Sequence, residues 1–419
     1  MSGGQRAVAT AGELEAAARD PEVGRIFVAA DIQGAASIRL QPGQHLLCDE
    51  GTSLHFAPGQ DGVELTSDNL VRGLRILADP RRRALFNAED VGTLGSLRLE
   101  TLRVTGSVRI LVRGAVRSGH VEAHDVDVAE ADARKFEERP SGFGVEVVPA
   151  AFTLWNLQED AAVVVTADLT GISAGRADAP VRGGGVFVGG FGDGGGGQLR
   201  VTRLETGEIH SDGGIAEGTP DRISGGVFTV HGAIVESVRN AGTVTTYGPN
   251  DMVLDNWGEV GRWVAEAAIT SHGPSGIGFV NFGTIGELRV LAPIETFGTG
   301  ARGLNVYAGT IGTTDLDRVA TKGDGAVGIQ ISQPIGRLTV RRGIETTGGI
   351  GNSLVKGVVT RLAAVPLSIK HGGSALSISV SGGLIALGEG VPRIELEGDV
   401  DQLTIATAAA PVAAGVGSL

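Results

Sequence analysis

The chain has 419 residues, and its hydrophobic content of 42% is ample for a packed core, which excludes wholesale disorder. Its 68 glycines follow no Gly-X-Y rule and only 15 prolines occur, which excludes collagen. The formal charge of -13 repels phosphate backbones, so we expect no nucleic-acid partner.

A short helix is predicted near the N-terminus, from Thr10 to Asp20. Thr10 is expected to cap it, and Glu13, three residues later, completes a capping box. Residues 1–24 therefore form an N-terminal segment with a capping helix. Short alternating runs separated by Gly, Pro, Asp or Asn follow, so the body of residues 25–405 is predicted to be almost entirely β. An alanine-rich tail, residues 406–419, ends the chain.

Features along the chain bear on compartment and surface. Cys48 is the only cysteine, so no disulfide forms within one chain, and we expect a buried structural thiol. The run Arg81-Arg82-Arg83 is the densest basic spot and is expected to be a solvated turn. No stretch reaches about 18 apolar residues and no secretory signal opens the chain, so we expect a soluble cytoplasmic protein without a membrane partner. A secreted location applies if a signal peptide has been removed.

A fixed period organises the second half of the chain. Two columns of residues recur every 25 positions: Gly248, Gly273, Gly298, Gly323 and Gly348, and then Leu254, Phe279, Leu304, Ile329 and Leu354. A unit of this length made only of short strands is typical of one coil of a parallel β-helix, in which coils stack about 4.8 Å apart. The sequence thus predicts one solenoid rather than two or three domains.

The columns also predict how the coil interior is filled. Ile269, Ile294, Val319 and Ile344 are expected to point inward. Two positions later lie small hydroxyl residues, which we expect to hydrogen-bond to one another along the column: Thr246, Ser271, Thr296, Thr321 and Thr346. Asn256 and Asn281 are predicted to stack inward as a structural amide ladder.

Two insertions depart from the period, near residues 183–197 and 213–226. Insertions in a solenoid map to loops on one face, often the binding face. Both are expected near the same turn, so the working face is predicted there. The later coils, from Gly323 onward, are expected to keep a uniform length.

The chain resembles the right-handed parallel β-helix proteins of the pectate-lyase-like superfamily. The likeness rests on the N-terminal helix, the segment LQPGQHLLCDEGTSLHF (residues 40–56) and the coil period, and it covers roughly residues 10–405. It implies a single-stranded right-handed β-helix and a carbohydrate substrate, because its members include pectate lyases, polygalacturonase-like hydrolases, fructotransferases and epimerases. Autotransporter passengers share this fold without catalysis, so the fold leaves function open.

Side chains beside an inward column point outward. Next to the Leu254 column stand Asp255, Val280, Asn305 and Gln330, and two positions further on stand Trp257, Phe282 and Tyr307, with His231 one coil earlier. Exposed aromatic rings flanked by polar groups are expected to bind sugar rings. An aromatic stack covered by a loop or by an oligomer partner is the alternative.

Glycoside cleavage needs two carboxyl groups about 5–9.5 Å apart. Neighbouring coils supply such pairs, and the catalytic candidates are Asp212, Asp251, Asp255, Glu217 and Glu295. The substrate-binding candidates surround them: His210, His231, Tyr247, Asn250, Trp257, His272, Arg302, Asn305, Tyr307 and Lys322. We therefore predict a hydrolase or glycosyl transferase, with no cofactor and no metal.

Two alternatives remain open. A polysaccharide lyase or epimerase on the same fold would use Arg302 or Lys322 as the base and an acidic residue to hold Ca²⁺. A non-catalytic β-helix would bind a glycan or serve as an assembly scaffold, and association into a homo-oligomer, with a trimer as the expected form, is a further hypothesis. Gly298-x-Gly300-x-x-Gly303 matches a dinucleotide fingerprint, but a strand follows it where a helix is required, so these are turn glycines.

Overall fold

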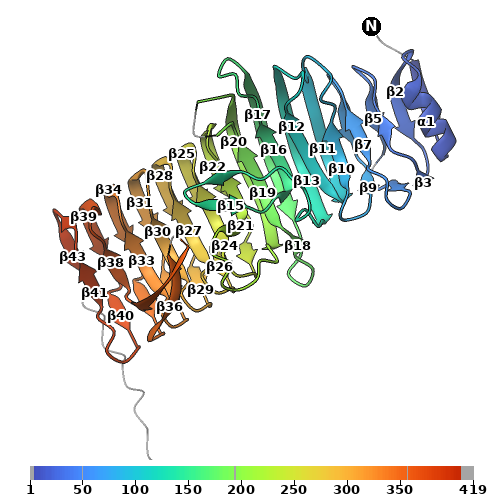
Figure 1. Cartoon of the computed structure of the whole chain (residues 1–419). Helices are drawn as coiled ribbons and strands as arrows, with labels where there is room; N and C mark the ends of the chain where they lie inside the picture. Colours follow the sequence, from blue (N-terminus) through green and yellow to red (C-terminus); the bar gives the residue numbers. More distant parts are fainter. Residues whose placement is uncertain (1–3, 50, 193–194, 356, 407–419) are drawn as a thin grey trace, which may run out of the picture.

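The computed structural model describes residues 4–49, 51–192, 195–355 and 357–406. Its strands lie side by side along an elongated solenoid (Figure 1). They form a 26-stranded sheet, here sheet A, and a 15-stranded sheet, here sheet B. Successive repeats pair in parallel. The all-β architecture is thus consistent with the predicted parallel β-helix, whereas the predicted tail, apart from Ala406, lies outside the described residues.

Helix α1 (Ala11–Arg19) covers the N-terminal end of the solenoid (Figure 1). The Thr10 hydroxyl accepts a hydrogen bond from the backbone N–H of Glu13, and the Glu13 carboxylate accepts one from the N–H of Thr10, at 3.3 and 3.2 Å. Leu14 and Ala17 are fully buried against the first strands. The predicted capping box is therefore confirmed, and it fixes where the helix begins.

Sheet B carries the outer face described below. Its parallel path consists of β4 (Ile38–Arg39), β7 (Val63–Leu65), β10 (Arg83–Asn87), β12 (Ser107–Val112), β16 (Ala150–Asn156), β19 (Gly184–Gly189), β21 (Arg222–Thr229), β24 (Asp251–Asn256), β27 (Ile277–Asn281), β30 (Arg302–Val306), β33 (Val327–Ile331), β38 (Leu367–Ile369) and β41 (Ile394–Leu396). The sheet A strands of the regular part are β20 (Gln198–Asp212), β22 (Ala233–Asn240), β23 (Val244–Thr246), β25 (Glu259–Ala265), β26 (Ile269–Ser271), β28 (Thr284–Val290), β29 (Ile294–Thr296), β31 (Thr310–Leu316), β32 (Val319–Thr321), β34 (Pro334–Val340) and β35 (Ile344–Thr346).

The inward columns are confirmed by the strand register. Val244, Ile269, Ile294, Val319 and Ile344 are successive partners in sheet A. In sheet B the successive partners are Leu254, Phe279, Leu304 and Ile329. All of these side chains are buried in the main hydrophobic core.

The fifth member of the sheet B column is a correction. Ile329 pairs with Leu367, not with Leu354. Leu354 instead lies in β36 (Ile350–Val355), which forms an antiparallel hairpin with β37 (Val358–Ala363). This hairpin is inserted between β35 and β38, so the coil that contains it is longer than its neighbours and the expected uniformity beyond Gly323 is wrong.

The polar columns of the interior differ from each other. Asn256 donates to Asn281 through its side-chain amide at 2.8 Å, which confirms the amide ladder. The hydroxyl column is buried, but Thr246, Ser271, Thr296 and Thr346 have no hydrogen-bond partner for their side chains among the described residues. The expected bonding along that column is therefore wrong, because a coil spacing of about 4.8 Å exceeds hydrogen-bond length.

The repeated glycines are required by close packing of successive turns. A Cβ on Gly273 would lie 1.8 Å from the carbonyl oxygen of Gly248, and one on Gly348 would lie 1.9 Å from that of Gly323. None of these glycines has a φ in the left-handed region. Steric exclusion by the preceding coil, rather than backbone conformation, therefore explains this column.

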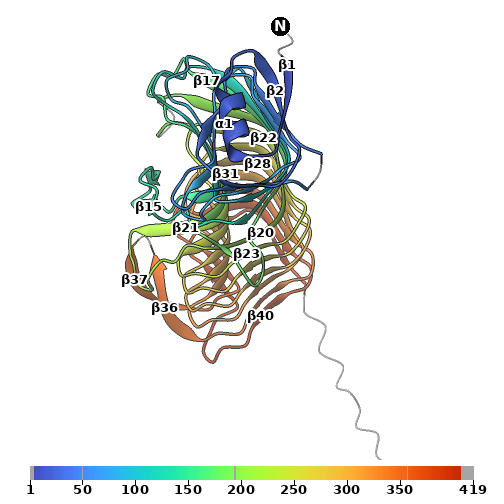
Figure 2. The same ribbon diagram turned by 90° about the vertical axis from the view of Figure 1, so that its right-hand side faces the viewer.

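Insertions cover the outer face of sheet B. Besides β36–β37, a hairpin of β14 (Ser141–Gly142) and β15 (Val145–Val147) projects from the same side of the solenoid (Figure 2). Beneath them lies a second apolar cluster, separate from the core: Leu111, Val147, Ala150, Trp155, Phe187, Ile223, Phe228, Val230, Met252, Trp257, Ile277, Val280 and Tyr307.

The two expansions predicted from the sequence do not share a turn. Residues 190–192 follow β19 and residues 195–197 lead into β20 of sheet A, whereas residues 213–221 follow β20 and lead into β21. The expectation of one common turn is therefore wrong, since they lie at opposite edges of sheet B. The second expansion, together with the two hairpins, is the one that approaches the candidate site.

Candidate functional site

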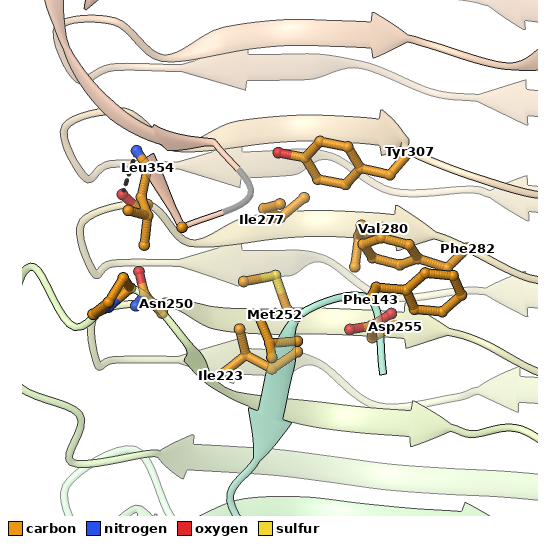
Figure 3. A pocket seen from close by; sticks show the side chains of 14 residues that line it. Phe143, Ile223, Asn250, Met252, Asp255, Ile277, Val280, Phe282, Tyr307 and Leu354 are labelled. Atoms are coloured by element: carbon orange, nitrogen blue, oxygen red, sulfur yellow. Dashed lines mark hydrogen bonds between the residues drawn. The ribbon is translucent and has the colours of Figure 1, made fainter. Parts of the chain in front are cut away.

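A pocket of about 70 Å³ lies on the outer face of sheet B (Figure 3). Its floor consists of side chains in or directly after the strands β24, β27 and β30, namely Met252, Asp255, Ile277, Val280, Phe282 and Tyr307. Its walls come from the three insertions: Phe143 and Val145 from the β14–β15 hairpin, Pro220 and Ile223 from the segment before and in β21, and Leu354 and Gly357 from the β36–β37 hairpin. Segments far apart in sequence thus converge here.

Asp255 is the carboxyl group of this pocket. Its side chain is fully buried, and neither oxygen meets a hydrogen-bond partner at good geometry among the described residues. Burial raises the pKa of Asp255 well above its ordinary value, and this outweighs the lowering by the Trp257 indole and the Asn256 backbone N–H. The apolar surroundings of Asp255 thus favour the protonated form of its carboxyl group.

The predicted aromatic column exists but does not face solvent. Trp257 is 3% exposed and Tyr307 is 8% exposed. Phe143 stacks on Phe282 at 4.4 Å between ring centroids and meets Trp257 edge-on at 5.3 Å. His231 completes this group, 5.4 Å from Trp257. The expectation of an exposed column is wrong, and the alternative of a stack covered by a loop is confirmed.

Asp251 and Asp212 lie at the turn before sheet B. The Asp251 carboxylate is buried and accepts hydrogen bonds from the backbone N–H groups of Gly213 and Gly248, at 3.1 and 2.8 Å. Burial raises the pKa of Asp251 to about 7, against the lowering effect of these two N–H groups. Asp212 pairs with Arg182 and accepts from the N–H of Gly214. Both aspartates thus bind the chain's own turns.

The other column beside this turn is a ladder of stacked rings on the outside of sheet A. His210, Tyr247, His272 and Phe297 follow one another with centroid distances of 6.0, 5.3 and 5.0 Å. The ammonium of Lys322 lies 4.2 Å from the Phe297 ring. His210 also contacts the hydroxyl of Tyr247 through Nδ1 at 2.9 Å. Partial burial lowers the pKa of His272. These predicted binding residues do come together, but away from the pocket.

Arg302 and Asn305 lie in β30. Arg302 is fully buried and donates to the hydroxyl of Ser353, in the β36–β37 hairpin, at 2.9 Å. Asn305 is fully buried, and its amide has no hydrogen-bond partner among the described residues. Because Lys322 lies on the ring ladder, the two bases considered for a lyase are not brought together.

The remaining candidates are spread around the site. Asn250 is buried and donates to the carbonyl oxygens of Thr219 and Arg222, which ties the 213–221 segment to the turn. Glu217 is exposed on that segment and lines a second cleft of about 250 Å³, which shares Asn250, Ser275 and Leu354 with the pocket. Glu295 is half-buried in β29 and lines neither cavity.

Residues that complete the pocket were missed by sequence reasoning. Phe143 and Leu354 reach it from hairpins that carry no repeat signal, and Leu354 falls by chance four periods of 25 residues after Leu254. Met252 and Ile277 are paired outward residues of β24 and β27, and Val280, which was expected outward but not as a site residue, lines the same pocket. The sequence signal that could have identified these three residues is a strand with apolar residues on both faces, which indicates that its outer face is covered.

No group of three or more His, Cys, Asp or Glu side chains in the described ranges is arranged to hold a metal ion. Within the same ranges, no helix combines the length and the apolar character needed to span a bilayer. Comparison with models of known protein families, with curated proteins and with solved structures finds no match to this chain.

Proposed function

We propose that the protein is a carbohydrate-active β-helix enzyme that hydrolyses or transfers glycosyl units, with Asp255 as the general acid. The observation that carries this proposal is a carboxyl group, fully buried and with a raised pKa, in a pocket that also contains Phe282 and Tyr307. A general acid must hold its proton at working pH, and an apolar site achieves this for a carboxyl group.

The second carboxyl group of the mechanism is assigned to Glu217. It is exposed, and its cleft adjoins the pocket through Asn250 and Leu354. The Glu217 side chain acts as base or nucleophile, while Asp255 protonates the oxygen of the departing sugar. Asp251 and Asp212 are left out because Oδ2 of Asp251 already accepts from two backbone N–H groups and Asp212 already pairs with Arg182.

The same proposal extends to the finer architecture. We infer a single-stranded right-handed helix of the pectate-lyase-like type, because parallel crossover connections are right-handed in about 98% of cases. The N-terminal capping helix and the stacked parallel strands support this assignment.

The test is product analysis across a panel of oligosaccharides with the full chain and its Asp255→Asn variant. Asparagine has the same shape as a protonated aspartate, so the fold is expected to persist while kcat falls by about 10²-fold or more. Glu217→Gln is expected to reduce kcat as well. Asp178→Asn, at an exposed position, is the matched control and keeps full activity. Unchanged turnover in Asp255→Asn would refute the assigned acid.

A non-catalytic glycan-binding β-helix is the second candidate. It is favoured by the ring ladder on sheet A, where His272 and Phe297 are exposed and offer ring surface for sugar stacking away from the Asp255 pocket. If oligosaccharides of the same panel bind to the chain and none is converted to product, the non-catalytic function is supported.

A further inference from the structure

A second cavity, of about 280 Å³, lies toward the N-terminal end of the same outer face of sheet B. It is formed by the turn before β10, by β12 and the residue after it, and by the segment that leads to the β14–β15 hairpin. Its lining is dominated by cations: Arg81, Arg82, Arg83, Arg109, Arg113 and Lys135, with Asp61, Glu137, Glu138, Leu111 and Phe136. The expectation that residues 81–83 form a mere solvated turn is therefore incomplete.

Arg109 is the buried centre of this cavity. It lies in β12, it is 2% exposed, and its guanidinium lies 4.2 Å from the ring centroid of Phe136. One nitrogen donates to Glu138 at 2.8 Å, whereas Nη1 has no partner among the described residues. Burial, opposed by Glu138 and reinforced by the nearby Arg83 and Arg113, lowers the pKa of Arg109 to about 10. It still carries its charge at neutral pH.

The carboxylates around the cavity are already committed. Asp61 binds Arg83, and Glu138 bridges Arg109 and Arg113. Two further acids lie next to the lining: Glu89 pairs with Arg113, and Asp132 pairs with Arg134 and Arg81.

Positive charge remains in excess after this pairing. The lining itself holds six cations against three carboxylates, namely Asp61, Glu137 and Glu138. The side chains of Arg82 and Lys135 are exposed and have no ion-pair or hydrogen-bond partner among the described residues. In a chain of formal charge -13, such a local excess stands out against the overall field.

We propose that this cavity binds an oxyanion group, a phosphate or a sulfate, between Arg82, Lys135 and the Arg109 cluster. Guanidinium groups match the oxygens of such anions with paired N–H donors, and lysine adds a point charge. The buried Arg109–Glu138–Arg113 bridge holds the cluster in place before the anion arrives, so little ordering cost remains for binding. The group is either a free ion or part of a larger ligand.

The site is independent of the proposed catalysis. Arg109 and Asp255 occupy the same outward column of sheet B, linked through Thr153, Phe187 and Phe228. Four strand steps of about 4.8 Å separate them, which is about 19 Å. A ligand at the cationic cavity thus need not contact the pocket.

The experiment is isothermal titration calorimetry of the full chain at constant ionic strength, with inorganic phosphate, inorganic sulfate, glucose 6-phosphate and glucose as probes. The test variant combines Arg82→Gln with Lys135→Gln, both exposed, so folding is unaffected. The matched control combines Arg25→Gln with Arg200→Gln, which removes the same charge from exposed positions of β2 (Val23–Val28) and β20 in sheet A.

We expect phosphate and sulfate to bind the native chain, glucose not to bind, and the test variant to lose about tenfold or more in affinity. The control should lose less than about twofold, as expected for a long-range charge effect screened by salt. Tighter binding of glucose 6-phosphate than of phosphate would show that the oxyanion is part of a larger ligand, and equal binding would show that the ligand is the free ion. Absence of binding by both ions, or equal losses in the test and control variants, would overturn the proposal.

Discussion

Thr296 and Thr321 occupy equivalent places in the buried hydroxyl column, yet only one of them is hydrogen-bonded. The Thr321 hydroxyl donates to the carbonyl oxygen of Ala326 at 2.7 Å, whereas the Thr296 hydroxyl has no partner among the described residues. A buried hydroxyl without a partner costs about 1–3 kcal/mol. The column is therefore retained for the size and shape of its side chains, and hydrogen bonding contributes at single positions.

Asp251 illustrates how burial sets pH dependence at a single residue. The folded chain holds its proton up to about pH 7, whereas an unfolded aspartate releases it near pH 4. Between these values the folded state binds more protons, so the free energy of unfolding falls as the pH rises. The stabilising contribution is complete below about pH 4 and is lost as the pH rises through about 7.

We predict that Asp251→Asn removes this loss, which is on the order of 3 kcal/mol for one buried carboxyl group. The measurement is the urea midpoint of the native chain and the variant at about pH 5 and about pH 8. Asp255 titrates in the same direction in both chains, so the difference between them isolates Asp251. Asp178→Asn, exposed, serves as the control, and equal pH slopes in the native and Asp251→Asn chains would contradict the assignment.

Sequence reasoning placed Asp255 correctly beside the inward Leu254 column but had no means to rank it above four other carboxylates. The alternation of side chains along a strand predicts direction only. The difference between Asp255 and Asp251 lies in their partners: one meets apolar side chains from the hairpins, and the other meets N–H groups of Gly213 and Gly248. These contacts join segments far apart in the chain, so no local pattern encodes them.

At the scale of elements, the turn before sheet B depends on the glycine column. We predict that Gly348→Ala destabilises the chain by about 1–3 kcal/mol, because the added Cβ would meet the Gly323 carbonyl oxygen at 1.9 Å and the coils must separate. Gly349 is the matched neighbour, since a Cβ there meets nothing closer than Asp324 Oδ1 at 3.6 Å.

Thermal unfolding of the two single variants checks this prediction. Gly349→Ala is expected to unfold within a few degrees of the native chain, and Gly348→Ala clearly below it. Similar losses in both variants would mean that conformational preference, not contact with the preceding coil, explains the repeated glycine.

The periodic elements were predictable and the hairpins were not, for a physical reason. A repeat constrains each coil by the same neighbours, so glycine, isoleucine and threonine recur at fixed spacing and reveal the strands. Strands β14, β15, β36 and β37 pair locally in antiparallel fashion or with one coil only. Each of these strands has surroundings of its own, so its sequence carries no repeated pattern from which the strand could be predicted.

At the scale of the whole molecule, the solenoid and its insertions are separable. The core is continuous from α1 to the last strands, and the outer apolar cluster on sheet B is distinct from it. Nearest-neighbour stacking stabilises each coil, so an insertion that leaves the turn ends in place need not disturb the stack. The β36–β37 hairpin meets this condition, because the backbone N–H of Ala364 donates to the carbonyl oxygen of Gly349 at 3.1 Å.

The register specifies how to remove that hairpin. Leu367 follows its partner Ile329 by 38 positions, where the preceding pair, Leu304 and Ile329, is 25 apart. Deleting the 13 residues 350–362 restores the spacing, and Ala363→Gly supplies the residue type found at the equivalent Gly325, whose φ is 69°. We predict that this shortened chain keeps the circular dichroism spectrum and the cooperative unfolding of the native chain.

The same deletion removes Leu354 and Gly357 from the pocket and opens the floor around Tyr307 to water. Turnover in the oligosaccharide panel should therefore fall by about 10²-fold or more, because the raised pKa of Asp255 depends on its apolar surroundings. Leu354→Ala, which thins one wall only, should lie between the two chains. A shortened chain that folds and retains full turnover would show that the hairpin serves neither catalysis nor the protonation of Asp255, and a chain that fails to fold would show that the hairpin belongs to the solenoid itself.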